Sequence, residues 1–123
     1  AGSTMANILV DEDFEDSRFS LCRLLEMSGH TVLEAKDGAE AVRVATGERP
    51  DLILMDVSLP DIDGLTATEQ IRAAGGRRVP IIMLSAHDAE QYHERAATAG
   101  CDAYVTKPVD FERLEALIRD YVG

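Results

Sequence analysis

The sequence predicts an α/β fold in which five parallel strands form one open, doubly wound sheet between two layers of helices. Short β-rich runs alternate five times with longer stretches of helical period, and no Pro/Gly/Ser-rich linker interrupts them. Residues 52–55 and 81–84 are wholly apolar, which is typical of central strands that helices cover on both faces. A chain of 123 residues that is 46% hydrophobic can form one such core. Residues 1–4, ahead of Met5, have the composition of an expression remnant, so we expect the single domain over residues 5–123.

The same pattern places each element. We expect strands at residues 7–11, 31–35, 52–55, 81–84 and 103–105. The first helix should begin after Asp16 or Ser17, because either side chain can accept a hydrogen bond from a free backbone N–H. It should end before Gly29, which can adopt the left-handed conformation of a helix stop. Its apolar face should contain Leu21, Leu24, Leu25 and Ser28. Further helices are expected at residues 38–46, 65–73, 89–99 and 111–122.

The composition argues against several classes of binding partner. Twelve Lys and Arg against 23 Asp and Glu give a net charge of −11, which would repel nucleic-acid phosphates and anionic lipids. No apolar run approaches the roughly 20 residues of a membrane-spanning helix. Cys22 and Cys101 lie far apart, without a disulfide framework or metal-ligand spacing. We therefore expect a cytoplasmic protein with reduced thiols that contacts neither nucleic acid nor a membrane.

Polar side chains gather where the predicted strands end. Asp11, Glu12 and Asp13 end the first strand, Asp56 follows the third, Ser85 the fourth and Lys107 the fifth. Because the carboxyl ends of parallel strands form the ligand crevice of an open α/β sheet, these side chains should share one rim. A single acid at a strand end is more often a helix cap or a solvated loop residue. The inference of a functional site therefore depends on the coincidence of several acids with one lysine.

Carboxylates gathered at this rim require a cation. Two of them at close range repel by about 4 kcal/mol at an effective dielectric constant near 20. Oxygen ligands without a neighbouring His or Cys are typical of Mg²⁺, or of Mn²⁺. A carboxylate can attack phosphorus only when its charge and that of the phosphoryl group are neutralised, which a divalent cation and a lysine ammonium accomplish.

Four motifs are specific enough to suggest a family. They are the acidic group after the first strand, Met55-Asp56-Val57-Ser58-Leu59-Pro60 with Asp63-Gly64 behind it, Leu84-Ser85-Ala86, and Lys107-Pro108. Together they resemble the receiver domain of two-component response regulators, the CheY-like proteins, over residues 7–122. The resemblance implies a flavodoxin/CheY-like sheet with strand order 2-1-3-4-5 and Asp56 as the phosphoacceptor.

The resemblance also implies a role for each matching residue. Glu12 and Asp13 would bind Mg²⁺ together with Asp56 and the backbone carbonyl of Ser58. Ser85 and Lys107 would contact the phosphoryl oxygens, and Tyr104 matches the aromatic switch position that works with Ser85. The two side chains that tune dephosphorylation would be Ser58 and His87.

The family pattern has one apolar residue and then two acids, whereas three acids follow Val10 in this chain. The apolar run before them and Arg18 after them favour Glu12 and Asp13 as the metal-binding pair, with Asp11 in the usual apolar place. The other alignment, with Asp11 and Glu12 as the pair, stays open.

The resemblance further implies a signalling cycle. A sensor histidine kinase or a histidine phosphotransfer protein would donate the phosphoryl group to Asp56 in a Mg²⁺-dependent reaction. The chain would not be an enzyme beyond self-phosphorylation and slow autodephosphorylation. Phosphorylation would change the surface of the fourth helix, fifth strand and fifth helix for a downstream protein or output domain, and a phosphorylation-dependent homodimer stays open.

Two other functions remain as alternatives. Asp11-x-Asp13 after an apolar strand resembles the start of haloacid dehalogenase-like phosphohydrolases, but Glu15 stands where they have Thr or Val, and a downstream acidic pair and a cap are missing from the sequence. A receiver-like interaction module that is not phosphorylated is the second alternative. Retention of Asp56, Ser85 and Lys107 argues against it.

Overall fold

A computed structural model describes residues 5–57, 63–75, 78–86 and 90–122, with side chains at all of these except 90–92. Its elements in chain order are β1 Asn7–Asp11, α1 Glu15–Met27, β2 Thr31–Ala35, α2 Gly38–Glu48, β3 Leu52–Asp56, α3 Gly64–Ala73, β4 Ile81–Ser85, α4 Glu90–Ala99, β5 Ala103–Thr106 and α5 Phe111–Val122. All strand pairs are parallel and the sheet order is β2-β1-β3-β4-β5. The expected fold class and strand order are confirmed. None of the described helices is long and apolar enough to cross a bilayer.

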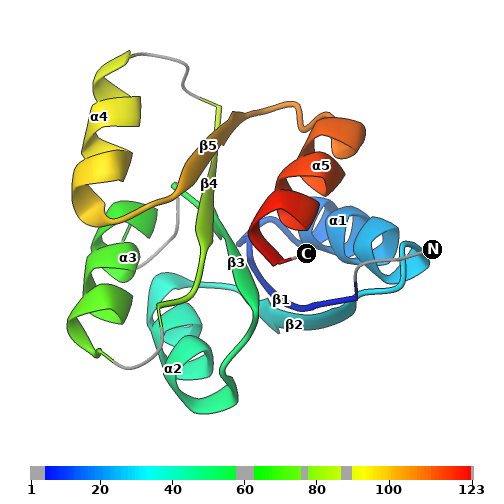
Figure 1. The fold of residues 1–123 in the computed structure, drawn as a ribbon, viewed down its shortest axis with the longest axis horizontal. Coiled ribbons are helices and arrows are strands. Elements are labelled where there is room, and N and C mark those ends of the chain that lie inside the picture. The colour runs from blue at the N-terminus through cyan, green and yellow to red at the C-terminus, as the bar shows by residue number, and fades with distance from the viewer. Residues whose placement is uncertain (1–4, 58–62, 76–77, 87–89, 123) are drawn as a thin grey trace.

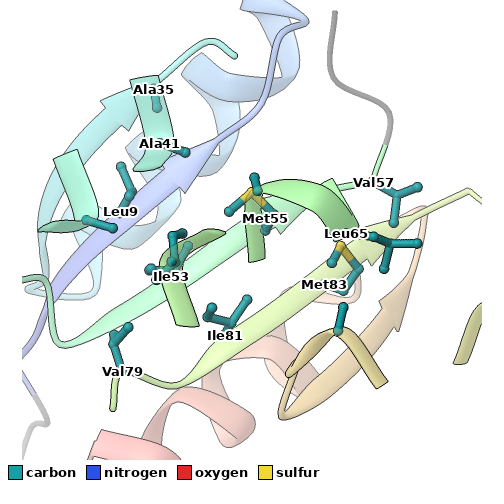
Figure 2. Packing of buried hydrophobic residues seen from close by; sticks show 14 of the residues in the cluster. Leu9, Ala35, Ala41, Ile53, Met55, Val57, Leu65, Val79, Ile81 and Met83 are labelled. Carbon is teal, nitrogen blue, oxygen red and sulfur yellow. The ribbon is translucent and has the colours of Figure 1, made fainter. Parts of the chain in front are cut away.

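Helices cover both faces of the sheet, with α1 and α5 on one side and α2, α3 and α4 on the other (Figure 1). Successive strand residues point to opposite faces, so each strand supplies both cores. Leu9, Ile53 and Met55 pack toward α2 and α3 (Figure 2), whereas Ile8 and Val10 pack toward α1 and α5. The wholly buried β3 and β4 account for the uninterrupted apolar runs in the sequence.

The strand register brings the polar strand ends to one edge of the sheet. Asp11 pairs with Met55, the residue before Asp56. Asp56 in turn pairs with Leu84, the residue before Ser85. Every strand therefore ends at nearly the same level, and the residues that follow form a common rim.

Helix boundaries differ from the sequence prediction most clearly at the start of α1 and the end of α2. Helix α1 begins at Glu15 after Phe14, which makes no side-chain cap, so the expected start after Asp16 or Ser17 is wrong. Acids in the first turn of α1 interact favourably with the helix dipole and replace the cap. Helix α2 continues through Gly47 to Glu48, and Arg49, with φ 52°, takes the left-handed cap position.

The buried face of α1 also differs from the expectation. Leu25 is fully buried and Gly29 has the predicted left-handed conformation, with φ 97°. Leu24, however, is 42% exposed, and Cys22 occupies the core in its place. Leu24 lies on the flank of the helix that borders the edge of the sheet where the acids gather, and it lines a groove described below.

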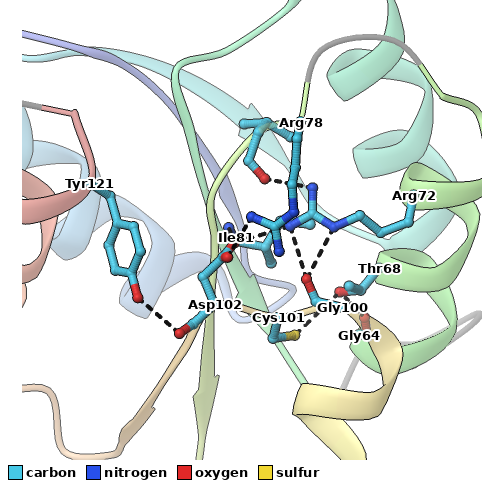
Figure 3. A network of polar contacts seen from close by, with 10 residues as sticks. Gly64, Thr68, Arg72, Arg78, Ile81, Gly100, Cys101, Asp102 and Tyr121 are labelled. Carbon is cyan, nitrogen blue, oxygen red and sulfur yellow. Dashed lines mark hydrogen bonds and ion pairs between the residues drawn. The ribbon is translucent and has the colours of Figure 1, made fainter.

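The opposite edge of the sheet is held by a polar network around Asp102 (Figure 3). One carboxylate oxygen accepts hydrogen bonds from Arg72 Nη2 at 3.0 Å and from the backbone N–H of Ile81 at 2.9 Å. The other accepts from Arg78 Nη1 at 2.6 Å, and the backbone carbonyl accepts from the Tyr121 hydroxyl at 2.9 Å. The network joins α3, β4, β5 and α5 at the edge away from the acids.

Candidate functional site

Three carboxylates meet where β1 and β3 end. Glu12 and Asp13 directly follow β1, and Asp56 is the last residue of β3. One carboxylate oxygen of each lies within 4.8 Å of the others. Glu12 and Asp56 are buried, with 4% and 3% exposure, whereas Asp13 is open to solvent. The cluster therefore has one accessible side, through which an ion and a substrate could enter.

Asp11 lies outside this cluster. It is the last residue of β1 and is completely buried. Its place in the strand puts it on the same face as Leu9, toward α2 and α3, whereas Glu12 follows after the strand has ended. The structure therefore brings Glu12 and Asp13, the pair favoured by the sequence, together with Asp56. The enclosed position of Asp11 gives no support to its role as an attacking nucleophile.

Lys107 bridges the two buried acids. Its Nζ lies 2.8 Å from Asp56 Oδ2 and 3.2 Å from Glu12 Oε2. Burial would lower the pKa of Lys107, but the hydrogen bond and charge of Asp56, together with Glu12, outweigh burial and raise it. The backbone N–H of Lys107 donates to the Ser85 carbonyl at 2.7 Å, and the peptide bond to Pro108 is cis. Lys107 is thus an ammonium held against Asp56, the acid that ends β3.

Glu12 is destabilised as an anion. Burial, followed by the hydrogen bond and negative charge of Asp56, raises the pKa of Glu12 to about 7, although Lys107 opposes the shift. One lysine is therefore not enough to neutralise the acids. A hard divalent cation bound by carboxylate oxygens would supply the missing charge, and this donor set fits Mg²⁺ or Mn²⁺. The residues present thus fit the metal that the sequence implied.

Arg18 holds the backbone of the acid pair. Its Nη1 donates to the Glu12 carbonyl at 2.9 Å, and its Nε donates to Glu34 Oε1 at 3.1 Å. The Glu12 N–H donates to the Ala35 carbonyl at 3.1 Å. The sequence analysis used Arg18 only for alignment and missed this positioning role. The signal that could have indicated this role is the position of Arg18, about one turn into the helix that follows the acids.

Gly64 allows α3 to begin directly against Asp56. The Gly64 N–H donates to the Val57 carbonyl at 2.9 Å. A Cβ at position 64 would overlap the Asp56 carbonyl oxygen and lie 2.9 Å from its carbonyl carbon. Asp63 caps the helix by accepting from the Thr66 N–H at 2.8 Å. The Asp63-Gly64 pair therefore fixes the backbone of Asp56 from behind.

Ser85 and Tyr104 lie on the α3/α4 face of the sheet. Ser85 ends β4 and is 1% exposed. Tyr104 pairs with Met83, two residues before Ser85, and its half-buried ring packs against the core under α4. Two other predicted residues, Ser58 and His87, lie outside the described residues.

An apolar groove opens beside the acids. Its volume is about 390 Å³, and Glu12 and Lys107 are among the residues that line it. The apolar lining comes from α1, β4, the segment between β5 and α5, and the start of α5, and comprises Leu21, Leu24, Leu84, Pro108, Val109 and Phe111. The groove therefore adjoins the candidate site through Glu12 and Lys107.

Comparisons with known proteins agree with this geometry. The response regulator receiver domain family matches residues 8–119. The polar-differentiation response regulator DivK of Brucella anthropi is 34% identical over 118 residues, which cover 95% of this chain and 96% of DivK. Protein PilH of Pseudomonas aeruginosa is 37% identical over 111 residues, which cover 89% of this chain and 92% of PilH.

Solved structures show the same relationship. The receiver domain of a sensor histidine kinase from Pseudomonas aeruginosa PAO1, with a magnesium ion coordinated in its active-site cleft, is 38% identical with a TM-score of 0.88, covering 96% of this chain and 98% of that one. The receiver domain of Francisella response regulator 1452 is 26% identical with a TM-score of 0.89, covering 95% and 96%. The family match, the identity to its members and the shared architecture lead to one conclusion: the chain belongs to the response regulator receiver domains.

Proposed function

We propose that Asp56 accepts a phosphoryl group in a Mg²⁺-dependent reaction. The observation that carries the proposal is the contact of Lys107 Nζ with Asp56 Oδ2 at 2.8 Å, opposite the acids of Glu12 and Asp13. An oxygen of Asp56 forms the new bond to phosphorus while the bond from phosphorus to the donor's imidazole nitrogen breaks, and the electron pair goes to that nitrogen. Lys107 stabilises the charge on the transferred group.

Four groups would hold the metal ion. They are the carboxylates of Glu12, Asp13 and Asp56, and the backbone carbonyl of Ser58. Bound there, Mg²⁺ neutralises charge between the nucleophile and the incoming phosphoryl oxygens. Water later attacks the aspartyl phosphate and restores the carboxylate, and we propose that Ser58 and His87 set the rate of this step.

Receiver domains generally act as signalling modules that interact with histidine kinases or phosphotransfer proteins. We propose that such a cytoplasmic protein, carrying a phosphohistidine, is the donor. The apolar groove supports this proposal because Glu12 and Lys107 are among the residues that line it. A donor that fills the groove with an apolar side chain would bring its imidazole to Asp56.

We propose that phosphorylation is transmitted through Ser85 and Tyr104. The Ser85 hydroxyl would bond a phosphoryl oxygen, and the Tyr104 ring would turn inward in response. The surface of α4, β5 and α5 would then change for a downstream partner, whether a protein, an output domain or a second copy of the chain. The placement of both residues on the α3/α4 face supports this route.

Intact-mass analysis tests the phosphoacceptor. Acetyl phosphate with Mg²⁺ should add one phosphoryl group to the wild type, and a chelator should prevent the addition. Asp56→Asn should abolish the labelling, whereas Glu48→Gln, which alters an exposed acid at the far end of α2, should not. Labelling that persists in Asp56→Asn would show that another residue is the acceptor.

A further inference from the structure

We propose that His93 is a positioning residue that holds Tyr104 against α4 and thereby sets how readily the switch responds. The inference rests on the proposed role of Ser85 and Tyr104. It goes beyond that role because it identifies a side chain on the opposite element that opposes the movement of the ring. Neither the motifs nor the alignment of the sequence pointed to His93.

The observation is a stack of two rings from different elements. The imidazole of His93, on α4, lies with its centroid 4.1 Å from that of the Tyr104 ring, on β5. The planes differ by 28°, so the two rings lie nearly face to face. Tyr104 is half-buried and His93 is exposed. The stack therefore connects α4 to β5 within the surface proposed to change on phosphorylation.

The strand register relates this stack to Ser85. Tyr104 pairs with Met83, and Ser85 lies two residues further along the same strand, so both side chains point to the same face. The ring of Tyr104 can therefore either remain on His93 or move toward the end of β4. Because Ser85 is only 1% exposed, a ring that moves there becomes more buried.

The stack belongs to the unphosphorylated arrangement of the site. There Lys107 Nζ contacts Asp56 Oδ2 directly at 2.8 Å. In this arrangement Tyr104 is stacked on His93. A ligand shifts such an equilibrium only by its different affinity for the two states. Contacts made only in the unphosphorylated state must therefore weaken the binding of a phosphoryl mimic.

The size of the effect follows from the strength of aromatic pairs. Such pairs stabilise a structure by an amount that corresponds to between about two- and tenfold in an equilibrium constant. Loss of the His93 ring should therefore increase the apparent affinity for beryllofluoride by about two- to tenfold. An imidazole replaced by a phenyl ring should preserve most of the stack.

Three variants separate the stack from general effects on α4. His93→Ala removes the ring, and His93→Phe keeps an aromatic ring in its place. Thr98→Ala is the matched control, because Thr98 is also exposed on α4 and its change to Ala gives a similar gain in helix propensity. The dissociation constant for beryllofluoride with Mg²⁺ is measured by NMR on protein with labelled tyrosine, and the ring signals of Tyr104 are recorded before and after addition.

We expect His93→Ala to bind beryllofluoride about two- to tenfold more tightly than the wild type, with His93→Phe and Thr98→Ala within about twofold. Equal affinity of His93→Ala and wild type, or an equal gain in Thr98→Ala, would overturn the inference. Without beryllofluoride, the Tyr104 ring signals should shift in His93→Ala more than in Thr98→Ala, and their constancy would refute the stack itself. A folded wild type that binds no beryllofluoride would instead overturn the proposed function, which separates the two failures.

Discussion

At the scale of single residues, three consecutive acids after β1 have three different environments. Asp11 still belongs to the strand and is fully buried on the face that also carries Leu9. Glu12 and Asp13 follow the end of the strand, so the alternation of the strand no longer separates them. Both can therefore meet Asp56. The end of β1 at Asp11 thus decides which two acids can share an ion.

Neutralising Asp13 should weaken Mg²⁺ binding by more than about tenfold, because a direct ligand of a hard cation contributes more than a nearby charge. Asp11→Val should leave the affinity within a few-fold, since Asp11 lies outside the cluster. Titration of the metal against Asp13→Asn and Asp11→Val measures both effects. Loss of binding in Asp11→Val together with normal binding in Asp13→Asn would mean that the alignment is wrong by one residue.

The raised pKa of Glu12 predicts a pH dependence with a definite sign. Burial and the charge of Asp56 raise its pKa in the folded protein to about 7 from its ordinary value of 4.5, so its contribution to stability is fully present below about pH 4.5 and is lost as pH rises through 7. With a chelator present, the free energy of unfolding of the wild type should therefore decrease between about pH 4.5 and 7, relative to that of Glu12→Gln. Urea unfolding at a series of pH values measures the difference.

Metal affinity should change in the opposite direction over the same range. Mg²⁺ must displace the proton of Glu12, so its affinity should rise as pH increases through about 7. Isothermal titration at each pH detects the rise. Parallel curves for wild type and Glu12→Gln in both measurements would show that Glu12 does not titrate in this range.

The positions of the acids, Ser85 and Lys107 were predictable because each stands at or just after the end of a strand that the sequence marks. The electrostatic interactions among these side chains could not be predicted from the sequence. The pKa of Glu12 depends on how closely Asp56 and Lys107 approach it in the fold, and those distances have no counterpart in the spacing of residues. The contact of Arg18 with the Glu12 carbonyl was missed for the same reason.

At the scale of elements, strands were easier to predict than helix boundaries. The apolar runs at 52–55 and 81–84 were assigned to strands from the sequence, and in the structure every residue of both runs is buried. The start of α1 was predicted too late because a side-chain cap was assumed, whereas α1 begins without one. The helix expected at residues 38–46 continues through Gly47 to Glu48, and Arg49 takes the left-handed position after it.

Two glycines in helices should respond oppositely to a methyl group. Gly64→Ala places a Cβ against the Asp56 carbonyl group and should cost about 1–3 kcal/mol of stability. Gly47→Ala meets nothing within 4 Å and should stabilise the protein by about 0.5–1 kcal/mol. Urea unfolding of both variants measures the difference. A neutral Gly64→Ala would mean that α3 can move away from Asp56 without cost.

At the scale of the whole molecule, the two faces of the sheet have separate tasks in the proposed function. The groove and the acids lie toward α1 and α5, whereas Ser85 and Tyr104 lie toward α3 and α4. Asp102 holds α3, β4, β5 and α5 at the far edge (Figure 3). Because that edge is fixed, we expect phosphorylation of Asp56 to move mainly the carboxyl ends of β4 and β5.

The coupling between the faces should pass through the Ser85 hydroxyl. The backbone carbonyl of Ser85 already accepts a hydrogen bond from the Lys107 N–H at 2.7 Å, which fixes the backbone of Ser85. The side chain therefore has to transmit the effect of phosphorylation. Beryllofluoride with Mg²⁺ should shift the Tyr104 NMR signals in the wild type and should shift them much less in Ser85→Ala at equal occupancy of the site. Ser85→Thr keeps the hydroxyl and serves as the matched control, with a response close to the wild type. An equal Tyr104 response in Ser85→Ala would show that the signal reaches β5 by a route that bypasses the hydroxyl.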